Sequence, residues 1–137
     1  MAKQQYKLRH IALSVPDVAK AQKFFEDAFG MTKAGNAQNG IYMTDGTINV
    51  ALLAKGGKAP GISAEPFYGV MHFGMWVDNL EQAEEQVKQA GATHFQGRPP
   101  NTPNSYYEVK YRDPSGIVFD ITASGWHGAV KNVKPAD

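Results

Sequence analysis

Two histidines and one aspartate occupy strand-like segments that lie far apart in the chain. His10 lies in "KLRHIALSV", His72 lies in "VMHFGMWV", and Asp120 lies in "GIVFDI". Aspartate is unfavourable in a strand, and a buried carboxylate has to be paired, hydrogen-bonded or bound to a metal. Two neutral imidazoles and one carboxylate that converge on one cavity form a facial triad, which leaves positions open for water and substrate. The three residues are therefore candidate ligands of Fe(II), Mn(II), Ni(II) or Zn(II).

Each member of this set also has an ordinary structural explanation. A single strand histidine is usually a hydrogen-bonded core or cavity residue, and Asp120 can be neutralised by Lys110 or Arg112 of the neighbouring strand. Of the other two histidines, His94 is expected in a loop or at a strand edge. His127 is expected at the surface of the C-terminal extension, with the rim of a pocket as the alternative. The metal hypothesis therefore depends on the two strand histidines taking equivalent positions in a repeated pattern.

Further side chains are expected to face the same cavity. In "SYYEVKY" the alternation of a strand puts Glu108 and Lys110 on the cavity side. Glu108 is a candidate catalytic residue, as a general base or as a completion of the metal site. The alternative is an exposed ion pair between Glu108 and Lys110. Tyr42 and Trp76 are expected to form an aromatic wall of the substrate pocket.

The chain contains two copies of one pattern, which is why the two histidines correspond. At one constant offset His10 aligns with His72 and Phe25 with Val87. Each copy predicts a strand, a short turn and an amphipathic helix. Asp17 and Asn79 are expected to cap the starts of the first and second helix. Gly30 and Gly91 are expected near their ends.

After each helix the hydrophobic period changes from that of a helix to that of a strand. "GIYMTDGTINVALL" and "SYYEVKYRDPSGIVFDI" each predict a hairpin, and a short strand is expected before each, near 32–34 and 93–96. Each half is therefore β-α-β-β-β. We expect one α+β domain over residues 1–137, made of two modules at about 7–53 and 70–122. A connector at 54–69 and a C-terminal extension at 123–137 complete it.

The overall composition is that of an ordinary globular chain. The 137 residues are 42% hydrophobic and 20% charged, with a net charge of +1 and no cysteine. This excludes a disulfide framework and Cys-ligated zinc, and the dispersed charges do not favour nucleic-acid binding. No apolar run approaches the about 18 residues of a membrane span, and "MAKQQYKLRH" lacks a signal-peptide core. We therefore expect a cytoplasmic protein with no membrane partner.

The sequence resembles the vicinal oxygen chelate superfamily, which includes glyoxalases, extradiol dioxygenases, methylmalonyl-CoA epimerases and bleomycin-resistance proteins. The resemblance covers roughly residues 7–122 and is carried by three segments: "RHIALSVPDVAKAQKFFEDAFGM", "HFGMWVDNLEQAEEQVKQAGA" and "YRDPSGIVFDI". It implies two tandem βαβββ modules whose strands form an open, cup-like mixed barrel around a metal. It also implies a homodimer.

The resemblance places metal ligands on His10, His72 and Asp120, although the last position is usually Glu in the family. The family's fourth ligand, often Glu or Gln, falls on Asn49 or Ala51 depending on the register of "INVALL". Asn49 can offer an amide oxygen to the pocket, whereas Ala51 can offer no ligand. This departure moves the pattern toward the three-ligand form of the dioxygenases.

Two functions are compatible with these residues. The first is a divalent-metal-dependent enzyme of the glyoxalase (lactoylglutathione lyase-like) or extradiol dioxygenase type, acting on a small oxygenated substrate chelated to the metal. The second is a metal-free protein that sequesters a small molecule, of the bleomycin-resistance type. The presence of all three candidate ligands favours the enzyme, because a pure binder has no need of them.

Overall fold

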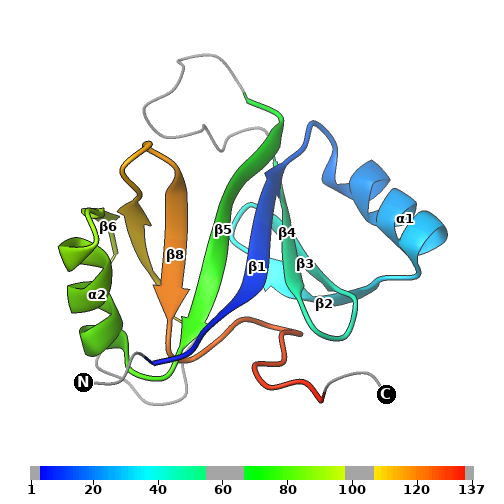
Figure 1. The fold of residues 1–137 in the computed structure, drawn as a ribbon. Coiled ribbons are helices and arrows are strands. Elements are labelled where there is room, and N and C mark those ends of the chain that lie inside the picture. The colour runs from blue at the N-terminus through cyan, green and yellow to red at the C-terminus, as the bar shows by residue number, and fades with distance from the viewer. Residues whose placement is uncertain (1–3, 55–66, 98–106, 135–137) are drawn as a thin grey trace.

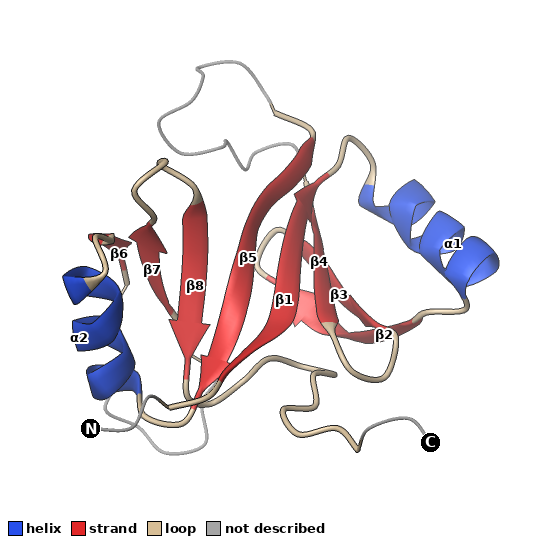
Figure 2. Ribbon diagram, viewed as in Figure 1, coloured by secondary structure: helices blue, strands red, loops and turns tan. Residues whose placement is uncertain are grey.

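One mixed sheet organises the molecule, and a helix lies at each end of it (Figures 1 and 2). The computed structural model describes residues 4–54, 67–97 and 107–134. Within these residues the sheet has eight strands in the order β2-β3-β4-β1-β5-β8-β7-β6. The elements along the chain are β1 (Tyr6–Ser14), α1 (Val18–Phe29), β2 (Thr32–Ala37), β3 (Gly40–Thr44), β4 (Asn49–Leu53), β5 (Gly69–Val77), α2 (Leu80–Gln89), β6 (Thr93–Gln96), β7 (Val109–Arg112) and β8 (Val118–Thr122).

The two longest strands, β1 and β5, run antiparallel at the centre of the sheet. β1 also pairs in parallel with β4, and β5 pairs in parallel with β8. Ala12 lies opposite His72, His10 lies opposite Gly74, and Gly74 lies opposite Asp120. Because side chains alternate across a strand, this register brings the three candidate ligands to one face of three adjacent strands.

Both helices begin and end where local side-chain chemistry predicts. The Asp17 carboxylate accepts a hydrogen bond from the Lys20 backbone N–H, and the Asn79 amide oxygen accepts one from that of Gln82. Helix α1 ends at Phe29 and is capped by Gly30, whose φ of 66° is left-handed and favours glycine. Helix α2 ends at Gln89 and is capped by Ala90, and Gly91 follows directly with a positive φ of 112°, as expected. Neither helix in the described parts of the chain has the length and apolarity needed to span a bilayer.

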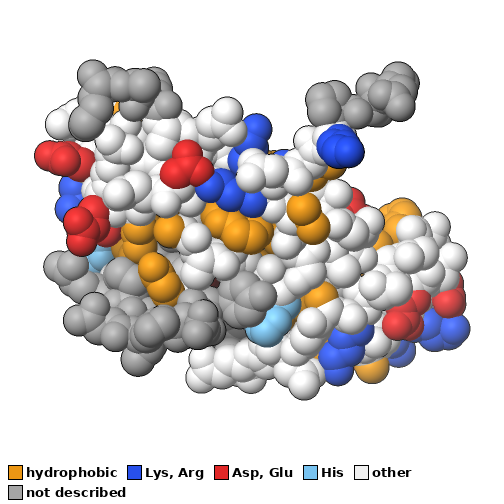
Figure 3. Space-filling view, turned by 90° about the horizontal axis from the view of Figure 1, so that it is seen from below, with side chains coloured by type: hydrophobic (Ala, Val, Ile, Leu, Met, Phe, Trp, Pro, Cys, Tyr) orange, Lys and Arg blue, Asp and Glu red, His pale blue; other side chains and the backbone are white. Residues whose placement is uncertain are grey.

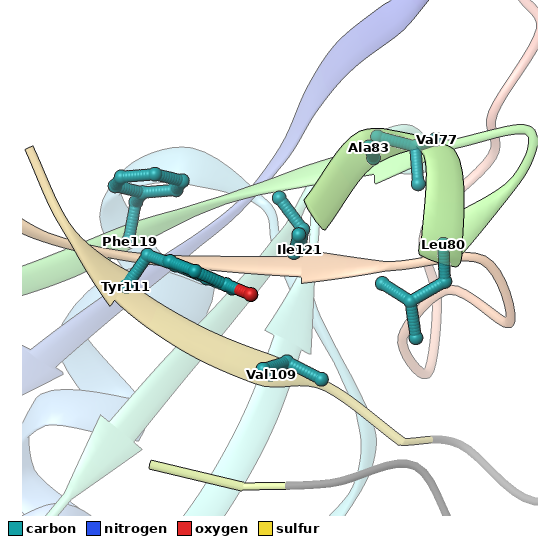
Figure 4. Close-up of a cluster of buried hydrophobic side chains, with 7 residues drawn as sticks. All are labelled: Val77, Leu80, Ala83, Val109, Tyr111, Phe119 and Ile121. Atoms are coloured by element: carbon teal, nitrogen blue, oxygen red, sulfur yellow. The ribbon is translucent and has the colours of Figure 1, made fainter. Parts of the chain in front are cut away.

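Apolar side chains pack between each helix and the sheet. Under α2, Leu80 and Ala83 contact the side chains of β5, β7 and β8 that face away from the histidines (Figure 4). Under α1, Phe25 contacts buried Met43 and Leu52 of β3 and β4. The opposite face of the sheet is thereby left for polar groups. On the molecular face in Figure 3, acidic and basic side chains are interspersed around hydrophobic ones, in line with the near-zero net charge.

The observed fold is a mixed α+β architecture with an open eight-stranded sheet, as expected. Both hairpins form, β6 has its expected bounds, and β2 continues three residues beyond its expected end. Ile117 directly precedes β8 and is 52% exposed, so the last strand begins one residue later than the alternation of "GIVFDI" indicates. Most of the expected connector at 54–69 lies outside the described residues. The division into tandem modules stays a prediction.

Candidate metal centre

His10, His72 and Asp120 converge on one point although they come from three strands. His72 Nε2 lies 3.1 Å from Asp120 Oδ2, and His10 Nε2 lies 3.4 Å from the same oxygen. The two Nε2 atoms are 3.4 Å apart. All three side chains are largely enclosed, with Asp120 fully buried. Three Lewis-basic atoms thus form a small triangle inside the protein.

The carboxylate of Asp120 has two oxygens in different surroundings. Oδ1 accepts a hydrogen bond of 2.6 Å from Lys110 Nζ, whereas Oδ2 is buried without a hydrogen-bond partner among the described residues. Burial by itself raises the pKa of this carboxyl, but His10, His72 and the ammonium of Lys110 outweigh it and hold the pKa well below its usual value. Asp120 is therefore ionised at neutral pH, and its free oxygen faces two imidazole nitrogens.

The triangle fits a divalent ion. For metal–ligand bonds of about 2.1 Å, neighbouring ligand atoms in tetrahedral or octahedral sites lie about 3.0–3.4 Å apart. The observed separations of 3.1–3.4 Å fall in that range. A buried anionic oxygen without a hydrogen-bond donor is a costly arrangement that a cation would relieve. His10, His72 and Asp120 are thus the residues that could hold a metal.

Lys110 bridges Asp120 and Glu108 beside the candidate centre. Its ammonium lies 2.6 Å from Asp120 Oδ1 and 3.2 Å from Glu108 Oε1. Burial by itself lowers the pKa of Lys110, but the two carboxylates together outweigh it and raise that pKa above its usual value. The lysine therefore stays charged. The expected pair of Glu108 and Lys110 exists, but Lys110 is mostly enclosed and its stronger partner is Asp120.

His10 is held on two further sides. Asn49 Oδ1 lies 2.7 Å from His10 Nδ1, and the indole of Trp126 stacks on the imidazole with ring centroids 4.7 Å apart. Asn49 Nδ2 donates to the backbone carbonyl of His127. Trp126 Nε1 donates to Glu108 Oε2 at 2.7 Å. The C-terminal residues therefore contact both the candidate centre and the candidate base.

A cavity of about 320 Å³ opens next to the triangle. His10, His72, Glu108 and Lys110 line it together with Tyr42. Apolar side chains and the amides of Gln38, Asn39 and Gln96 form the rest of its wall. Burial, and then the charge of Glu108, raise the pKa of Tyr42. Its hydroxyl therefore stays protonated at neutral pH and can donate a hydrogen bond into the cavity. The space suits a small molecule with oxygen atoms near the three ligands.

Two of the expected pocket residues lie elsewhere. Trp76 is not among the described residues that line the cavity, because its indole N–H donates to the Ala123 carbonyl and its ring packs against Gly125. Asn49 is fully buried beneath His10 and does not line the cavity either. Tyr42 lines it, as expected, and Glu108 does so without joining the triangle.

The register of β4 distinguishes the two positions considered for a fourth ligand. Asn49 lies opposite His10, whereas Ala51 lies opposite Ala12. In the other half, Asp120 lies opposite Gly74, two residues after His72. Ala51 therefore occupies the position in the first half that corresponds to Asp120 in the second. It lines the cavity and offers no ligand atom.

The sequence reasoning missed Trp126 as a contact of the centre. The sequence feature that could have indicated this contact is Gly74. An isolated glycine within a strand often marks the close approach of another group. A Cβ atom at Gly74 would lie 2.6 Å from the Trp126 ring. His127 has an exposed ring, as expected, but it stacks on Tyr42. His94 is exposed on the edge strand β6.

The model of the Glyoxalase/Bleomycin resistance protein/Dioxygenase superfamily matches residues 7–121. This match spans most of the sequence, so the chain belongs to that superfamily. The chain matches none of the curated proteins.

Solved structures with the same fold include several enzymes at low sequence identity. The Mn(II)-bound glyoxalase from Novosphingobium aromaticivorans has a TM-score of 0.67 and 17% identity, over 96% of this chain and 44% of that one. The methylmalonyl-CoA epimerase from Mycobacterium tuberculosis has a TM-score of 0.66 and 15% identity, over 84% of this chain and 85% of that one. The 2,3-dioxygenase LapB from Pseudomonas sp. KL28 has a TM-score of 0.66 and 15% identity, over 90% of this chain and 42% of that one. These similarities establish the fold.

Proposed function

We propose that this protein is a divalent-metal-dependent enzyme of the glyoxalase or extradiol dioxygenase type, acting on a small oxygenated substrate. His10, His72 and Asp120 would hold the ion. The observation that carries the proposal is the buried, ionised Oδ2 of Asp120, which faces two imidazole nitrogens without a hydrogen-bond donor among the described residues. The superfamily match and the Mn(II)-bound glyoxalase of the same fold support it.

A bound metal would supply Lewis-acid polarisation of substrate oxygens. The chain's own residues would bind and orient the substrate in the adjoining cavity. Tyr42 can donate its hydroxyl hydrogen to a substrate oxygen, and apolar side chains such as Leu53, Met71 and Phe95 can contact the apolar part of the substrate. Glu108 is the candidate proton acceptor, held in place by Lys110 and Trp126, each of which donates to one of its oxygens.

The absence of a ligand atom at Ala51 favours a three-ligand centre, as the resemblance to dioxygenases implies. The corresponding registers of β1 with β4 and of β5 with β8 also support our inference that the two halves are copies of one βαβββ module. In such a duplication, one half would have kept a carboxylate where the other carries Ala51.

Metal binding by tag-free protein tests this function. Chelator-stripped protein is titrated with Mn(II), Fe(II) under anaerobic conditions, Ni(II) and Zn(II), and the ion bound per chain is measured. We expect about one ion per chain, and at least a 100-fold loss of affinity in His72→Ala, because a lost ligand removes one of three metal bonds. His94→Ala is the matched control, since that histidine is exposed on β6.

Two results would contradict the proposal. One is a stoichiometry near zero for all four ions. The other is equally tight binding in His72→Ala and His94→Ala, which would remove His72 from the metal shell. Anomalous scattering from crystals grown without added metal would identify the ion that the purified protein carries.

A second candidate function is metal-free binding of a small molecule. The observation in its favour is the ion pair of Asp120 and Lys110, which compensates the buried charge within the chain. In that case the cavity would bind its ligand in the presence of a chelator, and the metal titration would show no uptake.

A further inference from the structure

The segment after β8 crosses the molecule and contacts both halves of the sheet. In Figure 1 it leaves the end of β8, passes below β5 and β1 and reaches the side of β2–β4. Gly128 O accepts a hydrogen bond from Thr44 Oγ1, and the Val130 N–H donates to Thr47 O. Arg9 donates to the carbonyls of Val130 and Lys131. We call residues 123–131 the C-terminal strap, which lies beyond the 7–121 that the superfamily model matches.

The strap places one aromatic ring directly on a candidate metal ligand. Trp126 is 5% exposed, and its ring lies at 12° to the plane of His10, close to parallel. Gly74 makes room for this ring, because any side chain there would collide with it. The stacked ring therefore restricts rotation of the His10 imidazole.

A hydrogen-bond chain through Asn49 determines which nitrogen of His10 carries the hydrogen. The His127 carbonyl can only accept, so the atom of Asn49 that faces it must be the amide NH₂. The other amide atom, Oδ1, is an acceptor and faces His10 Nδ1 at 2.7 Å. His10 Nδ1 must then donate, which leaves Nε2 of a neutral ring with a free lone pair directed at His72 and Asp120.

We propose that the C-terminal strap is part of the metal centre, with Asn49 and Trp126 as positioning residues that hold His10 with Nε2 as the ligand atom. The strap contributes the His127 carbonyl that orients Asn49, and the Trp126 ring that orients the imidazole. The metal part of this proposal rests on the proposed function. The hydrogen-bond chain does not, because it is complete without an ion.

The tautomer of His10 in metal-free protein gives the first test. Nitrogen-15 NMR of the imidazoles distinguishes a hydrogen on Nδ1 from one on Nε2. We expect Nδ1–H for His10 in the wild type and in Asn49→Asp, whose carboxylate still accepts from Nδ1. In Asn49→Leu, which has the same branching but no acceptor, we expect a large fraction of Nε2–H. An unchanged tautomer in Asn49→Leu would overturn the role of Asn49.

Metal affinity gives the second test. Loss of a group that orients a metal-binding histidine typically lowers affinity about 10–100-fold. We expect a loss of that size in Mn(II) affinity for Asn49→Leu and Trp126→Leu, and a smaller loss for Trp126→Phe, which keeps a ring on His10. Trp76→Leu is the matched control, because Trp76 also packs on the strap and donates to a strap carbonyl but does not contact His10.

The results separate this proposal from the proposed function. Equal Mn(II) affinities for Trp126→Leu and Trp76→Leu would show that the strap contributes only to stability, and would overturn the role of Trp126. A wild type that bound no metal would overturn the metal part together with the proposed function, while the tautomer would still decide the role of Asn49. Circular dichroism and thermal unfolding verify folding, and the conservative Asn49→Asp and Trp126→Phe serve if a leucine variant fails to fold.

Discussion

Asp120 shows that an ion pair and a metal site need not exclude each other. From the sequence, pairing with Lys110 and ligation of a metal were alternative explanations of one buried carboxylate. In the structure Lys110 takes Oδ1, while Oδ2 faces the histidines. Because a carboxylate carries two oxygens, the lysine can stabilise the charged form and still leave one oxygen for a cation.

Replacing Lys110 by methionine tests whether the lysine compensates the charge of Asp120 through Oδ1 and leaves Oδ2 for a cation. Removing one partner of a buried ion pair leaves the other charge uncompensated and costs about 3–5 kcal/mol. We expect a loss of this order in the free energy of unfolding of Lys110→Met, measured by urea denaturation with a chelator present. Lys23→Met removes an exposed pair with Asp27 and should cost about 0.5 kcal/mol or less.

Adding Mn(II) to the same measurement links the lysine to the centre. An ion on Oδ2 would neutralise the charge of Asp120, so Lys110→Met should bind Mn(II) more tightly. At equal free Mn(II) concentration the ion should therefore restore more stability to Lys110→Met than to Lys23→Met. Equal costs for the two variants in chelator would contradict the buried pair.

At the scale of elements, the two hairpins share a turn chemistry that the sequence indicates. Asp45 Oδ1 accepts from the backbone N–H groups of Thr47 and Ile48, and Asp113 Oδ1 accepts from those of Ser115 and Ile117. In each case one carboxylate closes the loop before the strand that carries site residues. The turns therefore help to set the registers that align the candidate ligands.

The turn at Asp45 predicts an acid-dependent contribution to stability. The backbone hydrogen bond from Ile48 is the main cause that lowers the pKa of Asp45 below its usual value. Stability from a lowered carboxyl pKa is present above the unfolded pKa of about 3.9 and is lost as the pH falls through the folded value. We expect Asp45→Ala to cost about 1–2 kcal/mol at pH 7 and less near pH 3, as measured by urea unfolding.

Asp27→Ala is the control for this prediction, because Asp27 is an exposed acid of α1 whose side chain bonds Lys23 and not a turn. Its cost should be small at both pH values. A cost of Asp45→Ala that stayed constant between pH 7 and pH 3 would show that the ionised carboxylate does not support the turn.

Local sequence patterns predicted the strands and helices, because each of these elements depends on residues that are neighbours in the sequence. Alternation set the faces of β1, β5 and β8, and capping side chains set the starts of both helices. The equivalence of His10 and His72 predicted their convergence, because equivalent positions of two copies meet when β1 pairs with β5. These predictions did not require knowledge of how distant segments pack.

The parts that were missed depend on the path of the chain after the last strand. Trp126 reaches His10 only because the backbone turns at Gly125, whose φ is 87°, and no periodic pattern specifies that turn. Trp76 was assigned to the cavity from strand alternation alone. It shares a face with His72, but it lies nearer the end of β5, where the strap covers it.

At the scale of the whole molecule, the candidate centre lies at the junction of the two halves. His10 comes from β1, while His72 and Asp120 come from β5 and β8 across the central antiparallel pair. Neither half alone contains the full set of ligands, but one chain does. Association between chains is therefore not needed to assemble the centre.

This arrangement makes a prediction about the homodimer that the family resemblance implies. The sheet is open at β2 and β6, and α1 exposes the large apolar side chains of Phe24 and Phe29. Open edges and exposed apolar surface favour pairing with another chain. We expect sedimentation equilibrium at micromolar concentration to give twice the chain mass of 14.9 kDa. A mass of one chain across the accessible range would contradict the homodimer.

Dilution then separates assembly from metal binding. Because His10, His72 and Asp120 belong to one chain, the dissociated protein should still bind about one ion per chain with an affinity within about threefold of the dimer. Mn(II) binding measured by electron paramagnetic resonance above and below the dissociation concentration checks this. Loss of the ion on dissociation would mean that a second chain supports the centre, in contradiction to a centre built within one continuous sheet.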